Sequence, residues 1–129
     1  MSSTPDQFLE FAVSAHQNAA GLEFNYRNAA SRAYYAAFHC CNAERSRYPS
    51  LAGDVTLGSH DHLYARIKAL PDSNTSRVLK SMAYIALMMK DVRRNADYLI
   101  ANPFSFEDSA QQIADAKKIL QKWKLLQTL

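Results

Sequence analysis

Five polar or aromatic residues recur at helical spacing between positions 23 and 45: Asn28, Arg32, Tyr35, His39 and Asn42. Steps of four and three residues place all five on one face of a helix. A solvent-facing stripe usually holds Lys and Glu. This stripe instead holds hydrogen-bonding groups, an aromatic ring and a histidine, which titrates near neutral pH. It is therefore either a half-buried polar network that fixes helix packing or part of a ligand site.

A second group of chemically capable residues lies at Arg93-Arg94-Asn95-Ala96-Asp97-Tyr98. Arg93 and Asp97 are four residues apart, so they can form an ion pair on one helix face. A surface pair there would stabilise the helix by only a few tenths of a kcal/mol. A half-buried pair would instead orient Arg93 towards the 23–45 segment or towards a ligand phosphate. Tyr98 lies on another side of the same turn.

The segment Gly58-Ser59-His60-Asp61-His62 is predicted to open a short helix. Ser59 or Asp61 can cap it, and the exposed amides could hold an anion. His60 and His62 are two residues apart, which turns them to different sides of a helix, so we expect no metal site. His16 is isolated, and we expect it on the surface. Phosphate-loop, dinucleotide, nucleophile-elbow and zinc-protease motifs are absent, and no cofactor is predicted.

These residues must be positioned by helices, because breakers are rare and Ala is frequent. Thr4 and Pro5 open the first expected helix, and Gly21 ends it. We predict further helices over about 23–45, 61–70, 75–101 and from Ser105 to about 126. Residues 46–59 are predicted to form a loop, and Asn102-Pro103 is predicted to end the fourth helix.

Apolar stripes on the last two segments indicate how the helices pack. The stripes comprise Val78, Met82, Ile85, Met89, Val92, Ala96 and Leu99, then Ile113, Ala116, Leu120, Trp123 and Leu126. Such stripes must bury against one another. We therefore predict an all-α fold, an antiparallel up-and-down bundle of four to five helices. We expect the methionines Met82, Met88 and Met89 to fill the core.

Composition agrees with one domain over residues 1–129, with 48% hydrophobic residues. Net charge is +3 overall, divided into −2 for residues 1–64 and +5 for residues 65–129. The basic half suits either a phosphate-rich partner or solvated lysine faces.

Adjacent Cys40 and Cys41 are read as reduced packing residues. The chain shows neither a signal peptide nor an apolar run of membrane-spanning length, so we expect a cytoplasmic protein away from membranes.

The segment Asn28 to His39, the later Ser59-His60 and the segment Arg93 to Tyr98 together resemble the HEPN domain family over roughly residues 23–126. The similarity is to small prokaryotic members with an R-A-Y-Y-A-x-F-H and an R-x-x-x-D-Y segment. It implies a helical bundle that forms a homodimer. Many members are metal-independent ribonucleases of toxin–antitoxin and antiviral defence systems, often paired with a nucleotidyltransferase-like protein.

The chain departs from the ribonuclease signature of this family, which is Arg, four to six residues, then His. Four residues separate Arg93 from Tyr98, which stands where the signature requires His, and no histidine follows His62. A tyrosine with a pKa near 10 is a poor base at pH 7. Arg32 and His39 satisfy the spacing on a different helix. Catalytic candidates are therefore Arg93, His39 and Arg32.

Three functions remain open from the sequence. The first is a HEPN-like protein that binds RNA, a nucleotide or a protein partner without the standard dyad. The second is a ribonuclease toxin with a rearranged site of Arg93, Arg32 and His39. The third is a non-catalytic antitoxin, immunity protein or complex subunit. The predicted ligand-binding residues are Arg32, Tyr35, His39, Arg93, Asp97 and Tyr98, with no metal.

Overall fold

The computed structural model describes residues 3–51 and 58–129, whose regular elements are all helices. The elements are α1 (Pro5–Gln17), α2 (Glu23–Ala43), the 3-10 turn η1 (Arg45–Arg47), α3 (Ser59–Lys68), α4 (Asn74–Tyr98) and α5 (Phe106–Leu126). The described residues include no strand. The all-α prediction is therefore confirmed.

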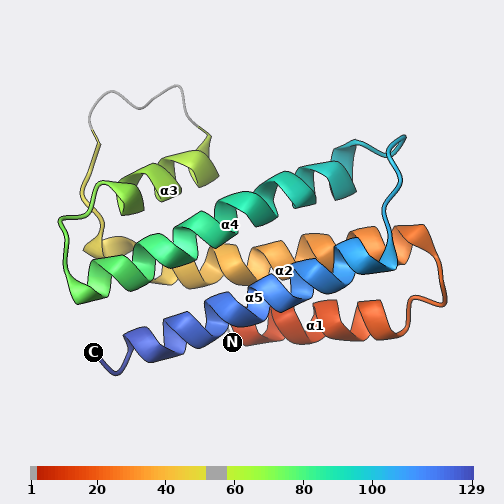
Figure 1. The fold of residues 1–129 in the computed structure, drawn as a ribbon, viewed down its shortest axis with the longest axis horizontal. Helices are drawn as coiled ribbons and strands as arrows, with labels where there is room; N and C mark the ends of the chain where they lie inside the picture. Colours follow the sequence, from red (N-terminus) through yellow and green to blue (C-terminus); the bar gives the residue numbers. More distant parts are fainter. Residues whose placement is uncertain (1–2, 52–57) are drawn as a thin grey trace.

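Four long helices run up and down along one axis (Figure 1). Each of the pairs α1 and α2, α2 and α4, and α4 and α5 is antiparallel. The short α3 lies on one side of this bundle, packed mainly against α4. The predicted up-and-down arrangement is confirmed, and α3 adds a partial layer over the faces of α2 and α4. None of the described helices is long and apolar enough to cross a membrane.

Side-chain caps fix where several helices begin. Thr4 accepts a hydrogen bond from the Gln7 amide at the start of α1, as its position before Pro5 predicted. Ser105 accepts one from the Asp108 amide and opens α5, also as predicted. Such caps satisfy amides that the first helical turn leaves unpaired.

Several predicted boundaries were wrong by a few residues. α1 ends at Gln17, so Gly21 (φ 74°) shapes the following turn rather than the helix end. α2 ends two residues before the predicted Arg45, and α3 begins two residues before the predicted Asp61. α4 ends at Tyr98, before Asn102-Pro103. Of the predicted loop 46–59, η1 overlaps the beginning, and residues 52–57 lie outside the described part.

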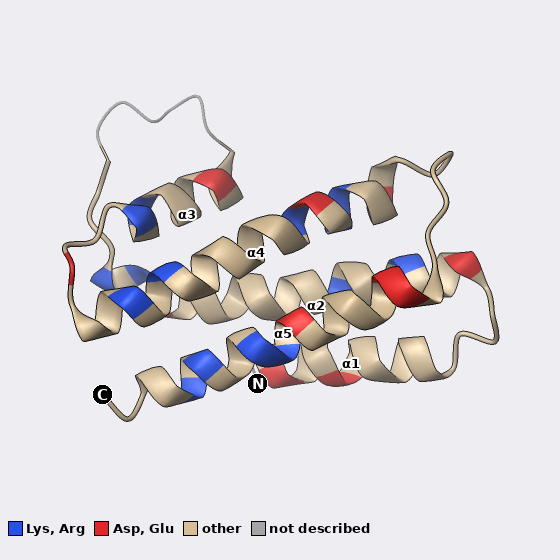
Figure 2. Ribbon diagram, in the orientation of Figure 1, with Lys and Arg blue, Asp and Glu red and all other residues tan. Residues whose placement is uncertain are grey.

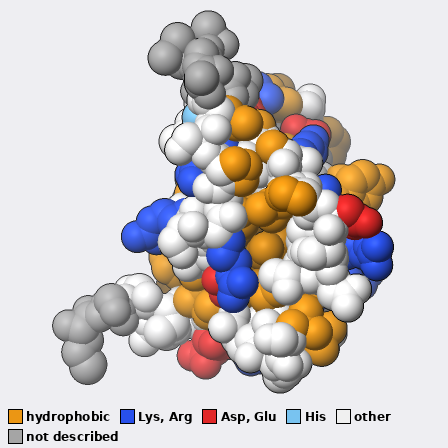
Figure 3. Space-filling model, turned by 90° about the vertical axis from the view of Figure 1, so that its left-hand side faces the viewer, with side chains coloured by type: hydrophobic (Ala, Val, Ile, Leu, Met, Phe, Trp, Pro, Cys, Tyr) orange, Lys and Arg blue, Asp and Glu red, His pale blue; other side chains and the backbone are white. Residues whose placement is uncertain are grey.

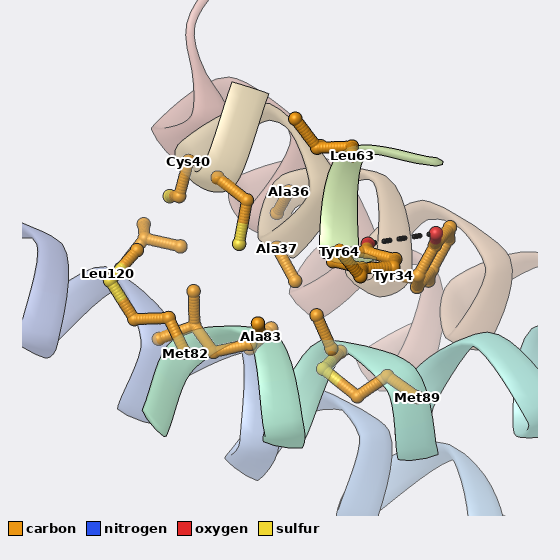
Figure 4. Packing of buried hydrophobic residues seen from close by; sticks show 14 of the residues in the cluster. Tyr34, Ala36, Ala37, Cys40, Leu63, Tyr64, Met82, Ala83, Met89 and Leu120 are labelled. Atoms are coloured by element: carbon orange, nitrogen blue, oxygen red, sulfur yellow. Dashed lines mark hydrogen bonds between the residues drawn. The ribbon is translucent and has the colours of Figure 1, made fainter. Parts of the chain in front are cut away.

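The core forms where α2, α4 and α5 meet, with Leu63, Tyr64 and Ile67 of α3 buried at its edge (Figure 4). Met82, Met89 and Ala96 of the predicted α4 stripe are buried, whereas Leu99 is 52% exposed because α4 has already ended. Met88 is 46% exposed, so its assignment to the core was wrong. On α5, Trp123 is half-buried and the other four predicted residues are buried.

A buried arginine at the start of α2 determines how α4 ends. Arg27 is 7% exposed and donates hydrogen bonds to the carbonyl oxygens of Asn95 (2.9 Å), Ala96 (3.0 Å) and Asn102. Its Nε also donates to Glu23 across 3.0 Å. The last carbonyls of a helix lack partners within the helix, and a cation suits that end of the helix dipole. Arg27 therefore fixes the end of α4 against α2.

His16 was predicted to be isolated on the surface, and this was wrong. Its Nδ1 lies 2.8 Å from the Ser109 hydroxyl of α5, and its ring contacts those of Tyr26 and Phe106. The last turn of α1 thereby joins α2 and α5. Periodicity within one helix did not reveal this, because the partners lie on other helices. Cys40 and Cys41 are buried free thiols, in agreement with their predicted packing role.

Candidate functional site

The predicted polar face of α2 is present and half-buried along its whole length. Its five residues each have intermediate exposure: Asn28, Arg32, Tyr35, His39 and Asn42. Behind them, fully buried alanines such as Ala33 and Ala37 let α2 pack closely on its neighbours. The larger side chains at positions 34 and 35 then reach towards α3 and α4.

Arg93 of α4 contacts aromatic rings from two helices. Its guanidinium carbon lies 5.4 Å from the ring centre of Tyr34, 5.9 Å from that of Tyr35 and 5.8 Å from that of Tyr98. A second cation, Arg32, lies 4.8 Å from the Tyr35 ring. We call these five residues the aromatic–cationic cluster. Guanidinium groups are attracted to ring faces at such distances.

The arginine at the centre of this cluster lacks the hydrogen bonds that a buried guanidinium normally makes. Arg93 is 9% exposed, and its Nε is buried without a hydrogen-bond partner among the described residues. Its nearest anion is Asp97, at 3.7 Å from Nη1. That carboxylate also accepts a hydrogen bond from the Ser31 hydroxyl of α2 (3.1 Å). The predicted Arg93–Asp97 pair therefore exists, but it is long and leaves donor capacity unused.

His39 lies at the edge of the aromatic–cationic cluster. Its ring packs on Phe8 of α1 with 4.7 Å between ring centres and lies 6.4 Å from the ring centre of Tyr35, and burial lowers its pKa. It lines a hollow of about 330 Å³ beside α1 and the end of α2. Arg32 lines a neighbouring hollow of about 370 Å³, also next to Phe8. Arg32, His39 and Arg93 all border the Tyr35 ring, but no hydrogen bond joins His39 to either arginine among the described residues.

A second histidine, His60 of α3, joins the cluster, although it was not among the predicted ligand-binding residues. Its Nδ1 lies 2.6 Å from the Tyr34 hydroxyl. Its ring stacks on Phe38 with 4.0 Å between centres and meets Tyr35 edge-on at 6.0 Å. The sequence held one indication of a role for His60, because Ser59-His60 is part of the resemblance to the HEPN family. No residue pattern, however, indicated which helices α3 would contact.

The surroundings of His60 favour its neutral form. Burial is the main cause of its lowered pKa, and the positive charges of Arg93 and Lys90 lower it further. Lys90 lies one turn before Arg93 and forms an ion pair with Asp61 of α3 at 2.6 Å. This pair holds the beginning of α3 against α4, one residue from His60.

The charge pattern of the two facing helices is mixed rather than uniformly basic. Basic and acidic positions alternate along the C-terminal half of α4, and the start of α3 carries an acidic one (Figure 2). The opposite end of the bundle, where α4 begins, has hydrophobic side chains at its surface with both basic and acidic ones around them (Figure 3). The aromatic–cationic cluster is therefore a local site and not part of a broad basic surface.

The chemistry available at the cluster is anion binding and ring stacking. The described residues contain no group of three or more His, Cys, Asp or Glu side chains able to hold a metal ion. Arginine donors suit phosphate oxygens, and exposed aromatic rings suit nucleobases.

Compared with protein-family models, curated proteins and solved structures, the chain matches none of them.

Proposed function

We propose that the protein is a HEPN-like protein that binds single-stranded RNA at the aromatic–cationic cluster, without the standard ribonuclease dyad. The observation that carries this proposal is the guanidinium of Arg93. It is nine-tenths buried, surrounded by three tyrosine rings, and its Nε has no hydrogen-bond partner among the described residues. A buried cation without hydrogen bonds destabilises a fold, so a ligand that accepts them would explain why it is there.

The neighbouring residues favour a nucleic acid strand over an isolated phosphate ion. Tyr98 is 70% exposed, and its ring centre lies 5.8 Å from the Arg93 guanidinium carbon although the two residues start from different sides of the turn. Arg32 and Tyr35 extend the cluster along α2. Rings interleaved with cations bind single strands by stacking bases and neutralising the backbone. A free nucleotide would use only part of this surface.

The wider biological assignment follows from the resemblance in sequence. A role in a prokaryotic defence, stress or toxin–antitoxin system is part of the proposal, as are a cytoplasmic location, a homodimer and a nucleotidyltransferase-like partner. The up-and-down bundle is compatible with it. The ribonuclease alternative with His39 receives less support, because the His39 ring packs most closely on Phe8 (4.7 Å) and lies farther from Tyr35 of the cluster (6.4 Å).

The test is binding of a fluorescently labelled, unstructured RNA 12-mer, measured by anisotropy at about 50 mM and 200 mM salt. We expect salt-sensitive binding, because neutralising phosphates releases counterions. Arg93→Met keeps an unbranched side chain along the arginine stem and removes the guanidinium with its charge. It should weaken binding at least tenfold while leaving the free energy of unfolding unchanged or higher, since a buried charge without hydrogen bonds is removed.

The matched control is Arg77→Gln, which removes the same charge from an exposed position at the other end of α4. It should bind RNA like the wild type. Tyr98→Ala provides a second test in case the buried Arg93→Met variant fails to fold, because Tyr98 is exposed. It should weaken RNA binding by roughly 1–3 kcal/mol for each base stacked on the ring. Wild-type protein that fails to bind at low salt would overturn the proposal. Unchanged affinity in both Arg93→Met and Tyr98→Ala would do so too.

A further inference from the structure

Three side chains form a hydrogen-bonded chain that runs from the core to the cluster. The hydroxyl of Tyr64 lies 2.9 Å from that of Tyr34, which lies 2.6 Å from Nδ1 of His60. Tyr34 and Tyr64 are both almost completely buried, and Figure 4 shows their hydroxyls joined at the edge of the core. His60 is half-buried at the other end of the chain.

The direction of these hydrogen bonds follows from the burial of Tyr64. Its hydroxyl has Tyr34 as its one hydrogen-bond partner in the parts of the chain that the structure describes. If Tyr64 donates, Tyr34 donates onward to Nδ1 of His60, and both buried hydroxyl protons are used. If the chain ran the other way, the Tyr64 proton would be buried without an acceptor, which destabilises the folded state because that donor loses its hydrogen bond to water without replacement. We infer that Tyr64 donates to Tyr34 and Tyr34 to His60.

This direction fixes the tautomer of His60. An Nδ1 that accepts a hydrogen bond carries no proton, so a neutral ring has its proton on Nε2. Burial and the charges of Arg93 and Lys90 keep the ring neutral by lowering its pKa. His60 therefore offers a single, outward N–H donor. It is not arranged to remove a proton from an RNA hydroxyl, because Nε2 is already protonated.

The cationic side chains next to His60 favour the same kind of ligand as its N–H donor, namely an anion that accepts hydrogen bonds. Arg93 and His60 both contact the Tyr34 ring, from α4 and α3 respectively. Lys90 is paired with Asp61 at 2.6 Å and Arg93 with Asp97 at 3.7 Å, and Arg32 beside the Tyr35 ring adds a further positive charge to the cluster. A phosphate group would be attracted by this added charge and could accept hydrogen bonds from both Arg93 and His60.

We propose that His60, held by the Tyr64–Tyr34 chain, forms with Arg93 a subsite for one backbone phosphodiester of the bound RNA. The inference rests on the proposed function, which it deepens by assigning a phosphate to α3 and stacked bases to Tyr35 and Tyr98. In this arrangement Lys90 contributes charge while Asp61 orients it. Tyr34 and Tyr64 are positioning residues, since they act through His60.

The tautomer is tested by nitrogen NMR of protein labelled with ¹⁵N-histidine at pH 7. We expect His60 to show the pattern of a neutral ring protonated at Nε2. Tyr34→Phe removes the hydroxyl that donates to Nδ1, so it should allow a mixture of tautomers. The matched control is Tyr35→Phe, which keeps its ring and lies outside the hydrogen-bonded chain. A wild-type ring protonated at Nδ1 would overturn the proposed chain.

The subsite is tested by comparing two labelled RNA 12-mers, one with normal phosphodiesters and one with uncharged methylphosphonate linkages. His60→Ala should weaken binding of the phosphodiester strand about tenfold, since hydrogen bonds to charged groups are worth about 1.5–3 kcal/mol. It should cause no further loss with the uncharged strand. His60→Gln, which retains an N–H donor near the position of Nε2, should recover part of the affinity, and the neighbouring His62→Ala should match the wild type.

The outcomes separate the two proposals. If wild-type protein binds RNA and His60→Ala binds it equally well, the phosphate subsite is wrong and the RNA-binding proposal stands. If His60→Ala weakens both strands equally, His60 acts on something other than the phosphate, and the subsite is again wrong. If the wild type binds neither strand at low salt, both proposals fall.

Discussion

The guanidinium of Arg27 donates a hydrogen bond to the carbonyl oxygen of Ala96 across 3.0 Å, joining the first turns of α2 to the last turn of α4. Asn95 and Asn102 supply further carbonyl acceptors to the same side chain. This contact lies one turn from Arg93, which must meet the rings of α2. The alignment of the aromatic–cationic cluster therefore depends on a buried arginine outside it.

Replacing Arg27 by Met should lower the free energy of unfolding by about 2–4 kcal/mol, because several carbonyl oxygens would lose a buried donor. Urea unfolding followed by circular dichroism measures this change. Arg47→Met is the matched control, since its side chain is 44% exposed and its ion pair with Glu44 is local, so it should change stability by less than about 1 kcal/mol. Equal effects of the two variants would contradict the role assigned to Arg27.

Stability should fall as the pH drops below about 6.5, in part because of His39 and His60. Burial lowers the pKa of His39, and burial with Arg93 and Lys90 lowers that of His60. In the unfolded chain both return to about 6.5. Between the folded and unfolded pKa values the unfolded chain binds more protons, so acid favours unfolding. Above about pH 6.5 the two residues should have no effect on this pH dependence.

Urea unfolding at several pH values between about 5.5 and 7.5 checks this prediction. A variant carrying His39→Gln and His60→Gln should lose less stability over that range than the wild type. His62→Gln serves as a control for the loss of a neighbouring histidine. An unchanged pH dependence in the double variant would show that neither ring is kept neutral by folding.

Cys40 and Cys41 should be unreactive in the folded protein. Burial raises the pKa of the Cys41 thiol to about 12 and raises that of Cys40 as well, and both side chains are fully buried. The reactive thiolate is therefore scarce and inaccessible. Labelling with a disulfide reagent should proceed only as fast as the protein opens, and Arg27→Met should accelerate it. Native labelling at the rate measured in concentrated urea would contradict this.

Much of the fold could be predicted because its signals are local. Thr4 with Pro5 and Ser105 with Asp108 fix helix starts within four residues of chain. The half-buried stripe of α2 followed from spacing alone. Helix ends were less accurate, since α4 ends where the distant Arg27 binds its last carbonyls. Leu99 was misassigned to the core for the same reason.

The sequence by itself determined that helices form, which faces they bury, and that Arg93 and the tyrosines lie on faces able to meet. Only the tertiary structure decided that His60 of α3 joins them. Periodicity assigns His39 and Tyr35 to one stripe of α2, yet His39 packs on Phe8 of α1. Tyr34, next to Tyr35 but turned about 100° around the helix, reaches His60 of α3 instead. Spacing orients residues within a helix, whereas the packing of α1 and α3 on α2 determines what each residue touches.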